Sequence, residues 1–214
     1  MPRASQPNFS YAHVFEPGTD PSAPPLLLLH GTGGSEHDLL RIGRAISPGS
    51  ALLSPRGDVS EGGALRFFAR LAEGVFDPAE IARRTQALAD FVAAASAHYT
   101  LDCHRLVAVG FSNGANIAST LLLLRPETIG GAILLRAMVV LDQPAATGSL
   151  TGHRVLVLNG SMDPLVPPDH PERLAALLRA GGAATQVQAI AASHGLTPQD
   201  VGAAQAWLRG HHGA

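Results

Sequence analysis

The amino-acid sequence predicts an α/β fold built on a doubly wound, mostly parallel sheet. Short apolar runs alternate with longer stretches of helical periodicity, which is the pattern of repeated βαβ units. The runs are apolar at nearly every position, so helices are expected on both faces of the sheet. The expected buried strands are 26–29, 51–54, 106–109, 132–135, 155–158 and 187–190, and residues 11–15 are a candidate antiparallel edge strand.

Capping residues mark the expected helices. Asp77-Pro78-Ala79-Glu80 supplies an N-cap, a proline at the first helical position and a carboxylate three residues after the cap, which predicts a helix over about 78–97. Thr197-Pro198-Gln199-Asp200 repeats this pattern and predicts a C-terminal helix. Three further helices are expected: one that Ser35 and Asp38 open and Pro48-Gly49 ends, one from Ala115 onward, and one through Leu174 and Leu178 that stops at Gly181-Gly182.

Size and composition narrow the class of protein. The 214 residues suit a single domain over 1–214, with 1–9 expected to be flexible. Fifteen basic residues, all of them arginine, against 17 acidic ones give a net charge of −2, which argues against nucleic acid or a membrane as partner and excludes a lysine Schiff base. The single cysteine, Cys103, and the lack of zinc-ligand spacing predict no structural metal site. Since no apolar run approaches the ~18 residues of a membrane span, we expect a cytoplasmic protein.

The strongest chemical signal is the segment Gly110-Phe111-Ser112-Asn113-Gly114. A buried strand is expected before it and a helix after it, which is the setting that a G-x-S-x-G nucleophile elbow requires. The serine of such an elbow lies on a sharply turned backbone, so the residues two positions away must be glycine. Ser112 is therefore the candidate nucleophile. The alternative interpretation is a glycine-flanked serine turn without chemistry.

A serine nucleophile needs an imidazole base and a carboxylate that holds the base in the right tautomer. In enzymes with this elbow, both partners follow the serine along the chain, in the order acid and then histidine. His194 is the preferred base, because it follows the expected strand 187–190 at the same sheet edge as Ser112. The other histidines after the serine are His153, at the opposite end of a strand, His170, at an expected helix start, and His211 and His212, in the C-terminal tail.

The preferred carboxylate is Asp163, which follows the strand 155–158 and precedes a proline that fixes the turn. Asp142 is the alternative, from the preceding loop, whereas Asp169 and Asp200 are interpreted as charges at helix starts. The candidate catalytic set is therefore Ser112, Asp163 and His194.

An oxyanion hole requires two backbone N–H donors near the serine. One is expected from Asn113, directly after the nucleophile, and the other from Thr32, in the glycine-rich loop Gly31-Thr32-Gly33-Gly34 that follows the first buried strand. That loop lacks the lysine of a P-loop and the G-x-G-x-x-G spacing of a dinucleotide site. His30, at the end of the strand, is interpreted as an orienting histidine and not as a second base.

Residues 56–77 form a long, glycine-containing segment that also carries Phe67, Phe68 and Phe76. Aromatic loops of this kind often cover a site, so these three residues and Met138 are the candidate substrate pocket. The alternative is a loop that packs its own phenylalanines against a helix.

Four of these motifs together resemble the phospholipase/carboxylesterase family of the α/β-hydrolase superfamily. They are Leu29-His30-Gly31-Thr32-Gly33-Gly34, the elbow around Ser112, Gly160-Ser161-Met162-Asp163-Pro164-Leu165-Val166-Pro167 and Ser193-His194-Gly195. Ser54-Pro55-Arg56-Gly57 and Arg66-Phe67-Phe68 are similar to a bacterial carboxylesterase subgroup related to hydroquinone-linked esterases, and acyl-protein thioesterases are also relatives.

The resemblance covers about residues 10–210 and implies hydrolysis of small carboxylic esters or thioesters without a cofactor or metal, often by a homodimer. It departs locally at Arg136-Ala137-Met138-Val139-Val140, where the subgroup usually has a proline after the first valine. Because only about a dozen residues lie between Asp142 and His153, we expect a minimal fold without a cap domain.

Three functions remain open at this point. The first is a serine carboxylesterase that works through an acyl-serine. The second is a non-catalytic protein of the same fold that binds a small apolar ligand. The third keeps the catalytic set but passes the acyl group to an alcohol or amine, or acts on a lysophospholipid, an acylated protein or a peptide.

Overall fold

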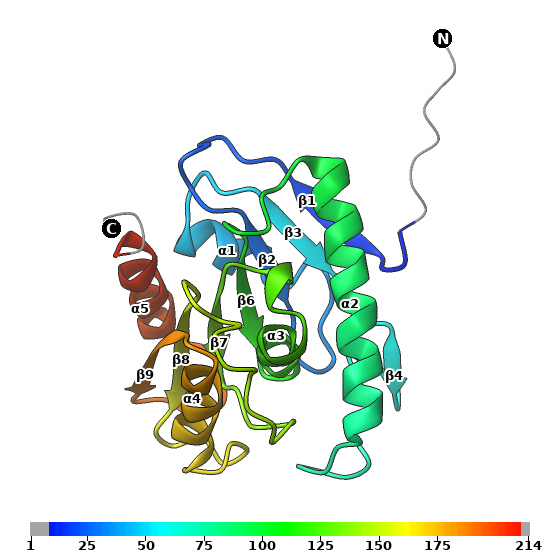
Figure 1. Ribbon diagram of the computed structural model, residues 1–214, viewed down its shortest axis with the longest axis vertical. Coiled ribbons are helices and arrows are strands. Elements are labelled where there is room, and N and C mark those ends of the chain that lie inside the picture. The colour runs from blue at the N-terminus through cyan, green and yellow to red at the C-terminus, as the bar shows by residue number, and fades with distance from the viewer. Residues whose placement is uncertain (1–8, 211–214) are drawn as a thin grey trace.

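The computed structural model describes residues 9–210, and a seven-stranded sheet lies at the centre of this part of the chain (Figure 1). The strand order is β1-β3-β2-β6-β7-β8-β9, and every neighbouring pair is parallel except β1 with β3. The strands are β1 (His13–Glu16), β2 (Leu26–Leu29), β3 (Leu52–Pro55), β6 (Val107–Phe111), β7 (Gly131–Leu135), β8 (Arg154–Gly160) and β9 (Ala184–Ile190). The predicted doubly wound sheet and its antiparallel edge strand are confirmed.

Helices cover both faces of the sheet. They are α1 (Leu40–Ile46), α2 (Pro78–Tyr99), α3 (Asn113–Leu124), α4 (His170–Ala180) and α5 (Pro198–Arg209), with a short 3₁₀ turn at Pro126–Thr128. Buried residues of α2, α3 and α4 belong to one hydrophobic cluster and those of α1 and α5 to the other. In Figure 1, α2, α3 and α4 lie in front of the sheet.

The apolar runs explain this arrangement. Successive side chains of a strand point to opposite faces, so a strand buried on both faces must be apolar throughout. In β2, Leu27 and Leu29 join the cluster under α2 and α3, whereas Leu26 and Leu28 join the cluster under α1 and α5, and all four are fully buried.

The parallel register brings several strand ends to one edge of the sheet. Leu29 lies opposite Gly110, Phe111 lies opposite Leu135, and Leu135 lies opposite Leu158. The loops that follow β2, β6, β7, β8 and β9 therefore leave the sheet on the same side, where open α/β sheets bind their ligands.

The capping predictions agree with the structure at α2 and α5. The Asp77 side chain accepts a hydrogen bond from the N–H of Ala79 at 2.9 Å, and Thr197 with Asp200 forms a capping box. In contrast, α1 begins at Leu40 and not near Ser35, because the Ser35 hydroxyl bonds the Asp38 carboxylate at 2.7 Å within a turn. None of the helices in the described residues is both long and apolar enough to cross a membrane.

The segment 56–77 is more ordered than its sequence predicted. It contains an antiparallel hairpin of β4 (Val59–Glu61) and β5 (Ala64–Arg66), joined by Gly62 and Gly63 with φ of +57° and +89°. Glycine adopts such positive φ values without the strain that a side chain would cause. The glycines that suggested an irregular loop therefore form a tight hairpin turn.

Candidate active site

The candidate nucleophile lies at the junction of β6 and α3. Ser112 has φ 52° and ψ −114°, a backbone conformation that non-glycine residues rarely adopt. A Cβ at Gly110 would lie 2.5 Å from the carbonyl oxygen of Gly114, and a Cβ at Gly114 would overlap the carbonyl oxygen of Leu29. Both glycines are therefore required by the close approach of strand and helix, and the turn that they permit places Ser112 at the N-terminus of α3.

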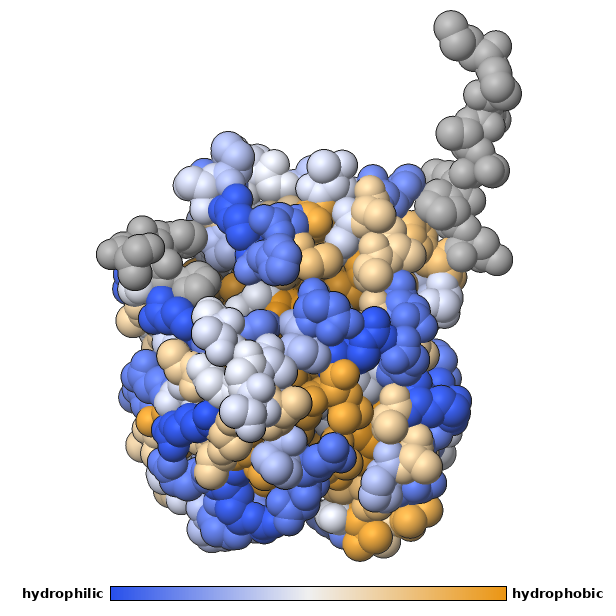
Figure 2. Space-filling view, viewed as in Figure 1, coloured by the Kyte–Doolittle hydropathy of each residue, from blue (hydrophilic) through white to orange (hydrophobic). Residues whose placement is uncertain are grey.

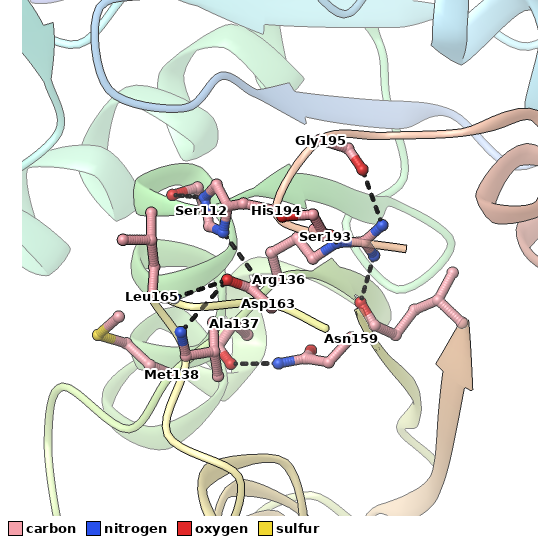
Figure 3. A network of polar contacts seen from close by, with 12 residues as sticks. Ser112, Arg136, Ala137, Met138, Asn159, Asp163, Leu165, Ser193, His194 and Gly195 are labelled. Atoms are coloured by element: carbon pink, nitrogen blue, oxygen red, sulfur yellow. Dashed lines mark hydrogen bonds and ion pairs between the residues drawn. The ribbon is translucent and has the colours of Figure 1, made fainter. Parts of the chain in front are cut away.

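His194 lies within hydrogen-bond distance of Ser112 on one side of its ring and of Asp163 on the other. Nε2 of His194 is 3.0 Å from Oγ of Ser112, and Nδ1 of His194 is 2.8 Å from Oδ2 of Asp163 (Figure 3). The structure thus brings together one residue each from the ends of β6, β8 and β9, although 82 positions separate Ser112 from His194.

The carboxylate of Asp163 is held from behind by backbone donors. Its Oδ1 accepts hydrogen bonds from the N–H groups of Leu165 at 2.9 Å and Val166 at 3.4 Å, and its side chain is 1% exposed. Because Oδ1 is occupied in this way, Oδ2 is directed at the imidazole. An imidazole with Nδ1–H facing Asp163 presents Nε2 as the proton acceptor toward Ser112.

Two further contacts tie the loop of Asp163 to that of His194. The N–H of Met162 donates to the carbonyl of Ala192 at 3.0 Å, and the N–H of Ser161 donates to Ile190 at 2.8 Å. A Cβ at Gly160 would lie too close to the carbonyl oxygens of Ala192 and Ser193. The acid and base loops therefore pack as one unit.

The two predicted oxyanion donors lie at the cavity that Ser112 also lines. Thr32 and Asn113 both line the same cavity as Ser112 and His194. Within residues 9–210, the backbone N–H groups of Thr32 and Asn113 donate no hydrogen bond. The N–H of Asn113 also belongs to the first turn of α3, where the helix carries partial positive charge that favours an anion.

The glycine-rich loop that carries Thr32 is fixed by contacts of His30, which the sequence singled out as an orienting residue. His30 is buried; its Nδ1 lies 2.7 Å from the carbonyl of Gly31, and its Nε2 accepts the N–H of Gly57 at 2.9 Å. Burial lowers the pKa of His30, with a smaller opposing contribution from the hydrogen bond to Gly31. A neutral histidine that bridges two loops agrees with the interpretation of His30 as an orienting residue.

Three polar side chains to which the sequence analysis assigned no role also hold the site. Nη1 of Arg66 donates to Oγ1 of Thr32 at 2.9 Å. Oδ1 of Asn113 accepts the N–H of Phe67 at 2.8 Å, and Oδ1 of Asn116 accepts the N–H of Met138 at 2.9 Å. Because Asn113 and Asn116 lie at the start of α3, the nucleophile helix anchors two walls of the cavity. The sequence carries no local signal for these pairs, which are 22 to 46 positions apart.

The cavity beside Ser112 has a volume of about 340 Å³. Its apolar wall includes Phe76, Phe111, Met138 and Leu165, and its polar wall includes Arg66, Arg70, Glu73 and Asn116. This volume is at the small end of ligand pockets.

The structure corrects part of the predicted pocket. Phe76 and Met138 line the cavity, but Phe67 and Phe68 do not, because both are fully buried in the hydrophobic cluster under α2 and α3. Phe76 contacts Phe68 edge-on at 5.6 Å between ring centroids. Both interpretations of the segment 56–77 therefore apply in part: two of its phenylalanines pack into the core, and the third lines the cavity.

The alternative histidines and aspartates lie elsewhere. Asp142 is exposed and pairs with Arg173 at 2.9 Å, and His153 bonds the carbonyl of Pro126 at 2.9 Å. His170 accepts the N–H of Val139 at 3.1 Å. His211 and His212 lie outside the described residues, as do residues 1–8 of the expected flexible segment 1–9.

These observations together define a hydrolase with the α/β-hydrolase fold and, within residues 9–210, no evident cap. The family model of phospholipase/carboxylesterase matches residues 10–212, so the chain belongs to this family. The chain is also 42% identical over 197 residues to "Putative hydrolase MhqD" of Bacillus subtilis (strain 168), covering 92% of this chain and 97% of that protein.

Solved structures agree with this assignment. A carboxylesterase from Bacillus cereus superposes with a TM-score of 0.91 at 39% identity, covering 95% of both chains. YahD, solved with malic acid, gives a TM-score of 0.87 at 32% identity over 94% of this chain and 98% of its own. A carboxylesterase from Mesorhizobium loti gives 0.84 at 33% identity over 90% of each chain.

Proposed function

We propose that this protein is a serine carboxylesterase that hydrolyses small carboxylic esters through an acyl-serine intermediate. The observation that carries the proposal is the unbroken hydrogen-bonded series from Ser112 Oγ through His194 to Asp163, with distances of 3.0 Å and 2.8 Å. A hydroxyl, an imidazole and a carboxylate in this order are what an activated serine requires, whereas a ligand-binding protein needs none of the three.

The proposed reaction has two halves. Ser112 Oγ attacks the ester carbonyl carbon while its proton passes to Nε2 of His194, and the N–H groups of Thr32 and Asn113 hold the resulting oxyanion. The carbon–oxygen bond to the alcohol then breaks, and His194 returns the proton to the departing alcohol. A water molecule, deprotonated by His194, attacks the acyl-serine in the same way and releases the acid and the free serine.

The cavity supports a small substrate with both apolar and polar groups. A volume of about 340 Å³ suits a short acyl chain, and the lining residues include the apolar Phe76 and Met138 and the charged Arg66. The related protein YahD was solved with malic acid, a small polar carboxylic acid. Long lipid chains are a poorer fit than short esters, and thioesters of the same size remain within the proposal.

The test is hydrolysis of p-nitrophenyl acetate by the wild type and by Ser112→Ala and His194→Ala. In a serine hydrolase, loss of either residue lowers kcat by on the order of 10⁶-fold, so both variants should be inactive. Ser161→Ala is a matched control, because Ser161 is an exposed serine of the acid loop.

Fluorophosphonate labelling gives a second measurement. The wild type should be labelled at Ser112, and Ser112→Ala should not be labelled at all. A wild type that binds small esters without turnover or labelling would instead identify a non-catalytic binding protein. Acyl transfer to added alcohols or amines in place of water would indicate an acyltransferase.

A further inference from the structure

Arg136 is a fully buried arginine that the proposed chemistry does not use. It directly follows β7 and has φ +59°, a left-handed conformation that is uncommon outside glycine. Its guanidinium points toward Ser193 and Gly195, in the loop that follows β9 (Figure 3). A buried charge in a strained backbone position calls for a physical explanation.

The guanidinium binds the two carbonyl groups that flank His194. Nε donates to the carbonyl of Ser193 at 3.0 Å, and Nη2 donates to the carbonyl of Gly195 at 3.0 Å. Among the described residues, neither Ser193 nor Gly195 takes part in a backbone–backbone hydrogen bond. The side chain of Arg136 therefore fixes the backbone on both sides of the candidate base.

A buried carboxylate balances the charge of the guanidinium. Asp200 accepts two hydrogen bonds from Arg136, at 2.7 Å and 3.0 Å, and is 2% exposed. Burial raises the pKa of Asp200, but hydrogen bonds from Arg136 and from Thr197 outweigh this effect and hold the pKa below its ordinary value. Asp200 is thus a carboxylate at neutral pH, and the planar two-point contact with the arginine has a defined geometry.

The backbone of the same segment reaches the nucleophile. The carbonyl of Leu135, immediately before Arg136, accepts the N–H of Ser112 at 2.9 Å, and the N–H of Arg136 donates to Leu158 at 2.9 Å. One short segment therefore contacts the nucleophile, the end of the strand that leads to the acid and the loop of the base.

We propose that Arg136, paired with Asp200, is a positioning residue that holds the His194 loop so that the imidazole stays between Asp163 and Ser112. The inference rests on the proposed function, because it assigns a role within the same site. Arg136 acts through the backbone and touches none of the reacting atoms. A residue with a purely structural role would stabilise the fold without affecting the rate of the chemical step.

The variants must remove the guanidinium without leaving a buried charge unpaired, since an isolated buried carboxylate could prevent folding. Arg136→Met combined with Asp200→Asn meets this condition, and the asparagine keeps an oxygen for the N–H of Thr197, which now donates to Asp200 at 2.7 Å. Arg136→Lys keeps the charge but lacks the planar, multidentate donor geometry with which the guanidinium contacts two carbonyls and a carboxylate. Leu174→Ala is the control, because it opens a cavity at a buried residue of α4.

In the double variant, kcat for p-nitrophenyl acetate should fall on the order of 100-fold with little change in KM, because misplacement of a catalytic group by about 1 Å has such an effect. Arg136→Lys should recover part of the loss. Leu174→Ala should lower Tm and leave kcat near the wild-type value. A double variant with wild-type kcat, or a fall in kcat matched by Leu174→Ala, would overturn the proposal.

A second measurement does not depend on turnover. The proton between His194 and Asp163 should give a strongly downfield ¹H NMR signal in the wild type and in Leu174→Ala, and the signal should broaden or vanish in the double variant. Retention of the signal in the double variant would contradict the positioning role. If the wild type proved inactive and unlabelled by fluorophosphonate, the proposed function would fail, but the NMR result would still report whether Arg136 holds His194.

Discussion

Two regions border the cavity, and they are built differently. On one side, the loops after β8 and β9 carry Asp163 and His194 and are held by backbone hydrogen bonds and by the buried pair of Arg136 and Asp200. On the other side, residues 70–77 are largely exposed: Leu71 is 73% exposed and Val75 is 50% exposed. Figure 2 shows apolar surface at the lower edge of the molecule, where the segment leading into α2 lies in Figure 1.

We expect the tightly held loops and the exposed segment to have different roles. Groups that move protons must stay within a few tenths of an ångström of their productive geometry, so they lie on loops with many fixed contacts. Residues that contact the variable part of a substrate tolerate looser packing, and loops of this kind differ most between related proteins. Changes in the first region should therefore alter kcat, and changes in the second should alter substrate preference.

Among the changes that test this difference between the two regions, the largest effect is expected from Asp163→Asn. The asparagine keeps the shape but can place an amide N–H toward His194, which favours the wrong imidazole tautomer, and kcat should fall about 10⁴-fold as in other serine catalytic sets. Asp142→Asn is the matched control, because Asp142 is exposed and pairs with Arg173. Steady-state hydrolysis of p-nitrophenyl acetate measures both. Near-normal kcat in Asp163→Asn would show that the buried loop of Asp163 does not contribute to the chemical step.

Much of the buried region follows from local sequence signals. The apolar runs, the glycines around Ser112 and the caps at Asp77 and Thr197 are short patterns, and each has one stable structural solution. Because β-strand order then brings the loops after β6, β8 and β9 to one edge, the proximity of Ser112, Asp163 and His194 could be predicted before any coordinates.

What could not be predicted depends on contacts between distant segments. Asp200 has the sequence signature of a helix-capping carboxylate, and it does cap α5, but its pairing with Arg136 joins positions 64 residues apart. Phe67 and Phe68 occur in a glycine-rich segment that suggested a loop over the cavity, yet a short hairpin before them directs both into the core. Neither outcome leaves a local pattern in the sequence.

A change in the exposed segment before α2 is expected to have an effect of intermediate size, on substrate preference. Phe76→Ala should enlarge the cavity and raise the ratio of kcat/KM for the hexanoate ester to that for the acetate ester at least about tenfold, because room for even one further methylene in an apolar pocket contributes roughly 1–3 kcal/mol. Leu71→Ala is the control from the same segment, since Leu71 is exposed and does not line the cavity. Equal profiles for the wild type and Phe76→Ala would show that this wall does not select the acyl chain.

The smallest effect concerns stability and pH at His30 and His170. Burial lowers the pKa of both, so the native protein binds fewer protons there than the unfolded chain, whose histidines titrate near ~6.5. Stability should therefore fall as the pH drops below about 6.5, by at most about 1.4 kcal/mol per pH unit for each histidine.

In His30→Gln the amide can replace both hydrogen bonds, to Gly31 and from Gly57, without titrating. The decrease in Tm between pH 7.5 and pH 5.5 should therefore be smaller than in the wild type. Thr85→Val is the control, because it removes the buried contact with Thr120 at 2.7 Å and should lower Tm equally at both pH values. An unchanged pH dependence in His30→Gln would mean that the glycine-rich loop takes up the proton without loss of stability. The loop that carries Thr32 would then tolerate change as the exposed segment before α2 does, unlike the tightly held loops of Asp163 and His194.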